Sequence, residues 1–347
     1  MTKRDYYFDN AKFILIFLVV FGHLIQSYIK SDTIIYNIYI LIYTFHMPAF
    51  ILVSGYFAKG IYEKGYIGKI TKKLILPYII FQLVYSIFYY FLFNKTNFEL
   101  DILNPHWSLW FLISLFCWNI LLIVFNKFKP TYAILAAFGI GLAVGYVDWI
   151  SNFLSLSRTF VFFPFFLAGY YLNAKHFNII RSYQTKLIAA ATIIIISIGI
   201  MYFPELNEKW LLGSKPYSQL ESVSALGLTK RVLIYAINLI MVGSFFSFVP
   251  RRKFFFTKWG KNTLYVYLLH GFIVRTFRGS SMEDYFNNTQ TIFIMIIVTF
   301  GLTILLSSKF ITAVAQPFIE LKLSKWKTTM AHFKENTHTL KQKTQNE

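Results

Sequence analysis

The sequence predicts an all-α, polytopic membrane protein with about ten transmembrane helices and both termini in the cytoplasm. The chain has 347 residues, of which 56% are hydrophobic and only 14% are charged, against about 25% charged residues in ordinary soluble domains. Its mean hydropathy is +0.52. Several runs reach about 18 or more residues almost without charge, which is the length that crosses a bilayer. A soluble fold of this size could not bury so much apolar surface.

The apolar runs place the transmembrane spans in order along the chain. Their approximate limits are 8–28, 34–58, 73–93, 107–127, 131–147, 158–174, 186–203, 229–249, 262–279 and 290–317. The last run is long enough to be bent or broken near Lys309. We expect residues 1–327 to form one integral-membrane domain and residues 328–347, which lack apolar periodicity, to form a polar cytoplasmic tail.

The loops between these runs alternate in basicity, which sets the orientation. One set carries most of the cations: Lys3 and Arg4; Lys59, Lys64, Lys69, Lys72 and Lys73; Lys127 and Lys129; Lys175, Arg181 and Lys186; Arg251, Arg252, Lys253, Lys258 and Lys261; Lys322, Lys325 and Lys327. The opposite loops carry fewer, including Arg158, Arg275 and Arg278, together with most of the loop acids. The positive-inside rule therefore places both termini in the cytoplasm. The net charge of +19 is thus mainly topological, and nucleic-acid binding is not expected.

The first apolar run contains two titratable side chains, Lys12 and His23. Eleven residues are close to three helical turns, so both side chains lie on one face, about 16 Å apart along the axis. Asp9 precedes Lys12 by three residues and can pair with it. Taken alone, Lys12 is also typical of a snorkelling interfacial lysine, and His23 of a packing histidine bonded to a carbonyl. Ionisable groups within a span more often mark a functional site.

Two further histidines lie at mid-span positions. His46 precedes Pro48, where we expect a kink, and Ser54-Gly55 follows in a stretch suited to close helix approach. His270 lies in the ninth run, three residues after Tyr267 on the same face. Three such imidazoles in so apolar a chain indicate a site. The single cysteine, Cys117, excludes disulfides within the chain, and no carboxylate cluster or metal-ligand spacing accompanies the histidines, so no metal is expected.

The fourth run opens with His106, Trp107 and Trp110 at the outer surface. An aromatic belt explains both tryptophans, and stacking on the face of a sugar is the sharper alternative. The longest external segment, 204–228, contains Pro204, Gly213 and Pro216 and could cover an outward-facing cavity.

These motifs, in this order, resemble the membrane acyltransferase-3 family, especially its fucose 4-O-acetylase-like and polysaccharide O-acyltransferase branch. The resemblance spans residues 5–320. It rests on DNAKFILIFLVVFGH with Asp9, Lys12 and His23, on FHMPAFILVSGYF, on the basic loop KITKKLILPY, on WFL at 110–112 and on YLLH at 267–270. Two features depart from the family pattern: the basic loop carries lysines where arginines are more common, and Gln316 stands in place of an acid in the closing QPF motif.

The resemblance implies acyl transfer across a membrane by an enzyme of the bacterial cytoplasmic membrane. Cytoplasmic acyl-CoA, acetyl-CoA in the first place, would be the donor substrate, with no permanently bound cofactor. A hydroxyl of an extracytoplasmic glycan or lipid-linked sugar would be the acceptor. The chain would act on the acceptor itself or pass the group to a separate transferase or glycan-assembly protein. The acceptor sugar, acetyl versus succinyl, and the oligomeric state stay open.

The chemistry assigns a role to each candidate residue. His23 would remove the proton of the acceptor hydroxyl or carry the acyl group itself. His46 or His270 would polarise the thioester carbonyl or orient the acceptor. Lys12, Lys69, Lys72 and Lys73 would bind the donor phosphates. The acceptor site would be lined by His106, Trp107, Trp110 and Tyr267.

Two other functions also fit a polytopic chain of this kind. A carrier or exporter of a glycan, lipid or metabolite would also use intramembrane charges and a proline-kinked helix. Against it, the chain shows no inverted repeat and few carboxylates within its spans for cation coupling. A non-catalytic scaffold for glycan-assembly enzymes would not explain why three histidines lie at mid-span positions.

Overall fold

The computed structural model describes residues 5–150, 153–202, 207–220, 224–280, 291–322, 324 and 326–328. Every regular element in these ranges is helical, which confirms the all-α class. The helices up to the middle of the chain are α1 (Tyr6–Ile25), α2 (Thr33–Tyr43), α3 (His46–Tyr56), α4 (Tyr66–Ile70), α5 (Leu76–Leu92), α6 (Trp110–Phe125), α7 (Pro130–Ala143) and α8 (Leu156–Tyr171). They are followed by α9 (Ala174–Ile180), α10 (Tyr183–Tyr202), α11 (Lys209–Leu212), α12 (Ser224–Phe248), α13 (Thr263–Arg278), α14 (Thr291–Leu306) and α15 (Lys309–Ile319).

Six helical stretches among the described residues are long and apolar enough to cross a membrane, which supports the polytopic class. They are Tyr6–Tyr28, Thr33–Tyr56, Tyr66–Leu92, Phe153–Tyr171, Tyr183–Tyr202 and Leu226–Phe248. A seventh arises if α14 and α15 are one broken span, since they meet at a 62° bend. This break next to Lys309 confirms the prediction for the last apolar run. The predictions for Lys3, Arg4, Lys325 and the polar tail from residue 329 onward concern residues outside this description.

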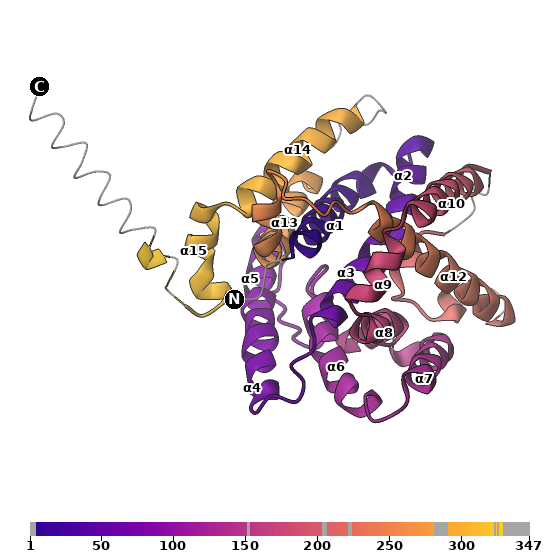
Figure 1. Cartoon of the computed structure of the whole chain (residues 1–347). Coiled ribbons are helices and arrows are strands. Elements are labelled where there is room, and N and C mark those ends of the chain that lie inside the picture. The colour runs from indigo at the N-terminus through magenta and orange to yellow at the C-terminus, as the bar shows by residue number, and fades with distance from the viewer. Residues whose placement is uncertain are drawn as a thin grey trace, which may run out of the picture.

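Helix α1 lies in the middle of the bundle (Figure 1) and contacts α2, α3, α13 and α14. Its first turns carry two buried polar residues, and one of them, Asn10, is fully bonded. The Asn10 amide nitrogen donates to the carbonyl oxygens of Pro250 and Arg252, and its oxygen accepts from the Thr257 hydroxyl at 2.6 Å. These bonds satisfy a buried amide and fix the register of α1 against the segment that follows α12. The position of His23, near the other end of α1, is set by the same contacts.

The second apolar run is broken one to two residues before His46 rather than at Pro48. Helix α2 ends at Tyr43, Thr44 and Phe45 form a turn, and α3 begins at His46. Pro48 then lies in the first turn of α3, where its missing N–H group has no helical partner to lose. His46 thereby occupies the start of a helix, at a break between two helices.

Helices α3 and α8 pack closely through glycine, as the Ser54-Gly55 pair predicts. A Cβ atom at Gly55 would overlap the carbonyl oxygen of Phe166, and one at Gly169 would overlap that of Leu52. The two glycines are thus reciprocal: each admits the backbone of the other helix. This contact fixes α8, and with it Arg158, relative to His46.

Candidate functional site

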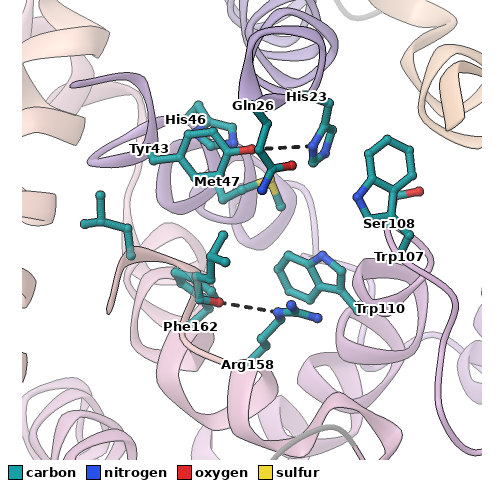
Figure 2. A pocket seen from close by; sticks show the side chains of 12 residues that line it. His23, Gln26, Tyr43, His46, Met47, Trp107, Ser108, Trp110, Arg158 and Phe162 are labelled. Atoms are coloured by element: carbon teal, nitrogen blue, oxygen red, sulfur yellow. Dashed lines mark hydrogen bonds between the residues drawn. The ribbon is translucent and has the colours of Figure 1, made fainter. Parts of the chain in front are cut away.

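His23 lies in the last turn of α1 and is surrounded by side chains from three other parts of the chain. Its ring centre is 4.4 Å from that of Trp107 and 5.5 Å from that of His270, and the two imidazole planes are 21° apart. The Tyr43 phenol oxygen is 3.4 Å from His23 Nδ1 (Figure 2). A partner at Nδ1 leaves Nε2 as the ring nitrogen available for chemistry. Segments far apart in sequence therefore converge on one imidazole.

His46 and His270 both have their Nδ1 atoms bonded to backbone carbonyls. His46 Nδ1 donates to Ile42 at 2.9 Å, and His270 Nδ1 donates to Val266 at 3.0 Å. Because a carbonyl only accepts, each Nδ1 carries the proton and each Nε2 keeps its lone pair. The three histidines singled out from the sequence thus come together, with His46 beside Tyr43 at 4.4 Å between ring centres.

His23 borders two cavities. The larger, of about 130 Å³, is lined by His23, Gln26, Tyr43, His46, Met47, Trp107, Ser108, Trp110, Arg158, Phe162, Leu211 and Leu212 (Figure 2). The smaller, of about 30 Å³, is lined by Ile16, Val19, His23, Met47, Phe50, Ser108, Trp110, Phe111 and Tyr267. Ile16 and Val19 lie between His23 and Lys12 on α1, so the smaller cavity extends from His23 toward the Lys12 end of the helix. His23 is one of four residues common to both linings.

His270 lines neither of these cavities. It is buried, with 1% of its surface exposed, and stacks behind His23 and 5.4 Å from Trp107. Its Nε2 atom has no hydrogen-bond partner among the described residues. His270 therefore contacts the site through His23, whereas His46 lines the larger cavity itself. The catalytic roles of both histidines stay predictions.

The segment that carries Trp107 is bonded to α13 through one tyrosine, and α13 is bonded to α5 through another. Trp107 has a φ of +35°, in the left-handed region that non-glycine residues seldom adopt. The hydroxyl of Tyr267 donates to the Ser108 carbonyl, and that of Tyr85 donates to the Leu268 carbonyl at 2.9 Å. Trp107 and Trp110 both line the larger cavity, and Tyr267 lines the smaller one. Contact of these residues with an acceptor stays a prediction.

His106 is not among the residues that line these cavities. Its Nε2 atom is 2.8 Å from the Ser86 hydroxyl, and its backbone N–H donates to Gln82 at 2.9 Å. Burial lowers the pKa of His106 below its usual 6.5, and Lys95 adds to the effect. These contacts join the 93–109 segment to α5. A direct contact between His106 and an acceptor stays a prediction.

The predicted donor cations lie in two places. Lys12 is 3.1 Å from Asp9, which confirms the expected pairing on α1, and its ammonium is 5.5 Å from the Phe57 ring centre. Lys69, Lys72 and Lys73 are exposed on α4 and the π-helical turn Thr71–Ile75, where Lys69 pairs with Glu63 at 3.0 Å. None of the four lines either cavity at His23. Their assignment to donor phosphates stays a prediction.

Glu320 lies one helical turn after Gln316, the residue that stands in place of the acid in the closing motif of the family. The Gln316 amide nitrogen donates to Glu320 at 2.9 Å, and the Tyr265 hydroxyl donates to the same carboxylate group. Glu320 thus connects α15 to α13, the helix that carries His270.

Sequence reasoning missed two contributors to the larger cavity. Arg158, which the sequence placed among the cations of the cation-poor loops, lies on α8 with its guanidinium 5.1 Å from the Trp110 ring centre. Tyr43 is the partner of His23. The external segment was predicted to cover a cavity, and its described part does so: Leu211 and Leu212 line the cavity, and the Ser157 hydroxyl donates to the Gly213 carbonyl at 2.8 Å. The available signal for Arg158 was its place at the start of an apolar run on the cation-poor side.

Comparison with known proteins gives one family and two relatives. A family model described as an acyltransferase domain matches residues 5–308. The chain is 31% identical over 140 residues to nodulation protein NolL of Sinorhizobium fredii, and 32% identical over 141 residues to nodulation protein NolL of Mesorhizobium japonicum. Each match covers 36% of this chain and 38% of the relative. No solved structure matches.

Proposed function

Because the chain belongs to the membrane acyltransferase-3 family, we propose that it is a membrane O-acyltransferase that uses His23 as its reacting group. It moves an acyl group, acetyl in the first place, from cytoplasmic acyl-CoA to a hydroxyl of an extracytoplasmic glycan or lipid-linked sugar. The observation that carries this proposal is the place of His23 between two cavities, one extending toward Lys12 and the other lined by Trp107, Trp110 and Arg158. An imidazole in that place can meet a thioester from one side and an alcohol from the other.

The proposed orientation follows the distribution of basic loops. The chain would cross the bacterial cytoplasmic membrane about ten times with both termini inside. Helix α1 then runs outward, so that Lys12 lies near the cytoplasmic surface and His23 in the outer half of the membrane. The helical rise over eleven residues, about 16 Å, is a distance that the extended pantetheine arm of CoA can bridge.

Two routes are compatible with this geometry. In the first, the acceptor oxygen attacks the thioester carbonyl while His23 Nε2 takes the hydroxyl proton, and the C–S bond breaks as that proton passes to the sulfur. In the second, His23 Nε2 attacks the thioester and expels the CoA thiolate, and the acceptor oxygen then displaces the imidazole and releases its proton to the thiolate or to solvent. Detection of an acyl group on His23 in the absence of acceptor selects the second route.

Each neighbour of His23 has a defined part in either route. Tyr43 bonds to Nδ1 and orients the ring, and His270 packs behind it. His46 faces the cavity, where it can hold the acceptor or polarise the thioester carbonyl. Trp107 and Trp110 offer apolar faces to a sugar ring. Lys12, with Lys69, Lys72 and Lys73, would attract the donor phosphates at the cytoplasmic surface.

The test is mass spectrometry of surface glycans from cells with and without the gene, together with a donor requirement. The proposal expects one acyl group per modified sugar in cells that have the gene, and no transfer in purified vesicles without acyl-CoA. A carrier or exporter, the alternative function, would instead move substrate across vesicles with no CoA requirement. Transport of substrate across vesicles without CoA, together with surface glycans of equal mass with and without the gene, would show that the protein is a carrier and not an acyltransferase.

A further inference from the structure

The larger cavity at His23 contains an arginine and no carboxylate. Arg158 is the only fully charged side chain among its lining residues. Its Nε atom is 3.4 Å from the Leu212 carbonyl oxygen, a long hydrogen bond, and its guanidinium lies beside Trp110 at 5.1 Å. Among the described residues, no Asp or Glu forms an ion pair with it. Figure 2 shows Arg158 and His23 on opposite sides of the space that they line.

Membrane topology does not explain this cation. The positive-inside rule depletes arginine from the outer side of the membrane, and an unpaired charge in a confined apolar site carries a desolvation cost. Holding the external segment at the Leu212 carbonyl engages one of five N–H donors. Four donors of the fork have no described hydrogen-bond partner, so the energetic balance favours an anion in the cavity.

A second arginine reinforces the positive potential near the same ring system. The guanidinium of Arg275 is 4.8 Å from the ring centre of Trp107, which lines the cavity together with Trp110. Arg275 Nε is buried without a hydrogen-bond partner among the described residues. The guanidinium of Arg278 is also 5.7 Å from the Trp107 ring centre. Three cations thus approach the two tryptophans, and no acidic side chain is among the residues that line the larger cavity.

We propose that the acceptor carries an oxyanion, a carboxylate or a phosphate, which Arg158 binds while the acceptor hydroxyl faces His23. This inference rests on the proposed function and narrows its substrate class to an anionic sugar. A planar guanidinium fits both oxygens of a carboxylate or phosphate, and its interaction across the cavity fixes which hydroxyl reaches the imidazole. Selection by charge suits a cavity whose other lining side chains, among them Gln26, Ser108 and His46, include no carboxylate that would repel an anion.

The first arm of the test identifies the native acceptor. Glycans from cells with and without the gene are separated by anion exchange, and the acylated component is located by mass spectrometry. We expect the acyl group on a sugar that bears a carboxylate or a phosphate, and phosphatase treatment distinguishes the two. An acyl group on a neutral sugar overturns the inference and leaves the proposed function standing. Absence of any gene-dependent acyl group refutes the proposed function itself.

The second arm tests Arg158 on the full-length chain in phospholipid vesicles, with the isolated acceptor and its charge-removed form. The charge is removed by reduction of the carboxylate or by the phosphatase. We expect the wild type to prefer the anionic form by about 30-fold or more in kcat/KM, as for removal of one partner of a buried charge pair. Arg158→Gln should erase that preference and raise the acceptor KM, with little change in the KM for acetyl-CoA. Arg158→Lys should restore it in part.

Lys30→Gln is the matched control, since Lys30 is an exposed cation of the same outer side. It should keep the wild-type preference. Two results overturn the assignment of Arg158 to the anion. One is loss of the preference for the anionic acceptor in Lys30→Gln, which would be a general effect of charge. The other is an equal fall in kcat/KM for both acceptor forms in Arg158→Gln, which would be a general effect on folding.

Discussion

The imidazole of His23 stacks on that of His270 at 5.5 Å between ring centres, with 21° between their planes. The two rings come from helices α1 and α13, almost 250 residues apart in sequence, and only His23 contacts the cavities. His270 is anchored through Nδ1 to its own helix. A buried ring therefore backs the half-buried ring of His23 and limits the orientations that His23 can adopt.

Replacement of His270 should impair catalysis through the position of His23. We expect His270→Ala to lower kcat about 10- to 100-fold, because a small displacement of a reacting group is costly, with little change in either KM. His270→Phe keeps a ring against His23 and should retain more activity than alanine. Rates measured on purified protein in vesicles check this. Equal loss in both variants would instead point to a direct role of His270 Nε2.

Removal of the basic cluster on α4 and the π-helical turn should weaken donor use. With Lys69, Lys72 and Lys73 all changed to Gln, the KM for acetyl-CoA should rise about 10-fold, since each exposed cation contributes up to about 1 kcal/mol, and added salt should mask much of the difference. The double variant Lys127→Gln with Lys129→Gln removes exposed cations from another of the basic loops and should leave that KM unchanged. Donor kinetics identical to the wild type in the triple variant would remove these lysines from the donor site.

The α3–α8 contact should tolerate no side chain at its glycines. Gly55→Ala places a methyl group against the Phe166 carbonyl, and overpacking of this kind costs about 1–3 kcal/mol. Gly139→Ala is the control, because nothing lies within 4 Å of its added Cβ, and it should be neutral or stabilising by up to about 1 kcal/mol. Thermal unfolding in detergent compares them. Equal Tm values for the two variants would show that the helices are not in close contact.

The His106 contact predicts a pH dependence of stability. Burial lowers the pKa of His106 in the folded chain below its usual 6.5. Below pH 6.5 the unfolded chain therefore binds more protons at His106 than the folded chain does. The contribution of neutral His106 to the free energy of unfolding is complete above pH 6.5 and is lost as the pH falls toward the pKa of the folded chain. His106→Gln should reduce the fall in Tm between pH 7.5 and 5. If Tm falls with pH as steeply in His106→Gln as in the wild type, protonation of His106 is not linked to unfolding.

Periodicity along the chain predicted which residues share a face, and this was sufficient for parts of the site. The three mid-span histidines indicated a site, and the structure brings them together. The spacing of Lys12 and His23 indicated a donor contact at Lys12, which stays a prediction, since Lys12 lines neither cavity. The break before His46 depends on the turn at Thr44 and Phe45, which Pro48 obscured. The contact of Tyr43 with His23 could not be predicted, because periodicity along one helix does not say which neighbour it packs against. Arg158 could have been singled out by its place on the cation-poor side, but not assigned to the cavity at His23. His106 was taken as part of the outer surface, and its bond to Ser86 requires knowledge of the fold.

Acyl transfer across the membrane through His23 is measured in vesicles that contain the full-length chain, with acetyl-CoA on the cytoplasmic side only and acceptor on the opposite side only. Wild-type protein and His176→Ala, an exposed histidine of α9, should both acylate the acceptor across the membrane. His23→Ala should insert normally and lower the rate about 1,000-fold, within the range for loss of a general base. Transfer at the wild-type rate by His23→Ala would contradict the account.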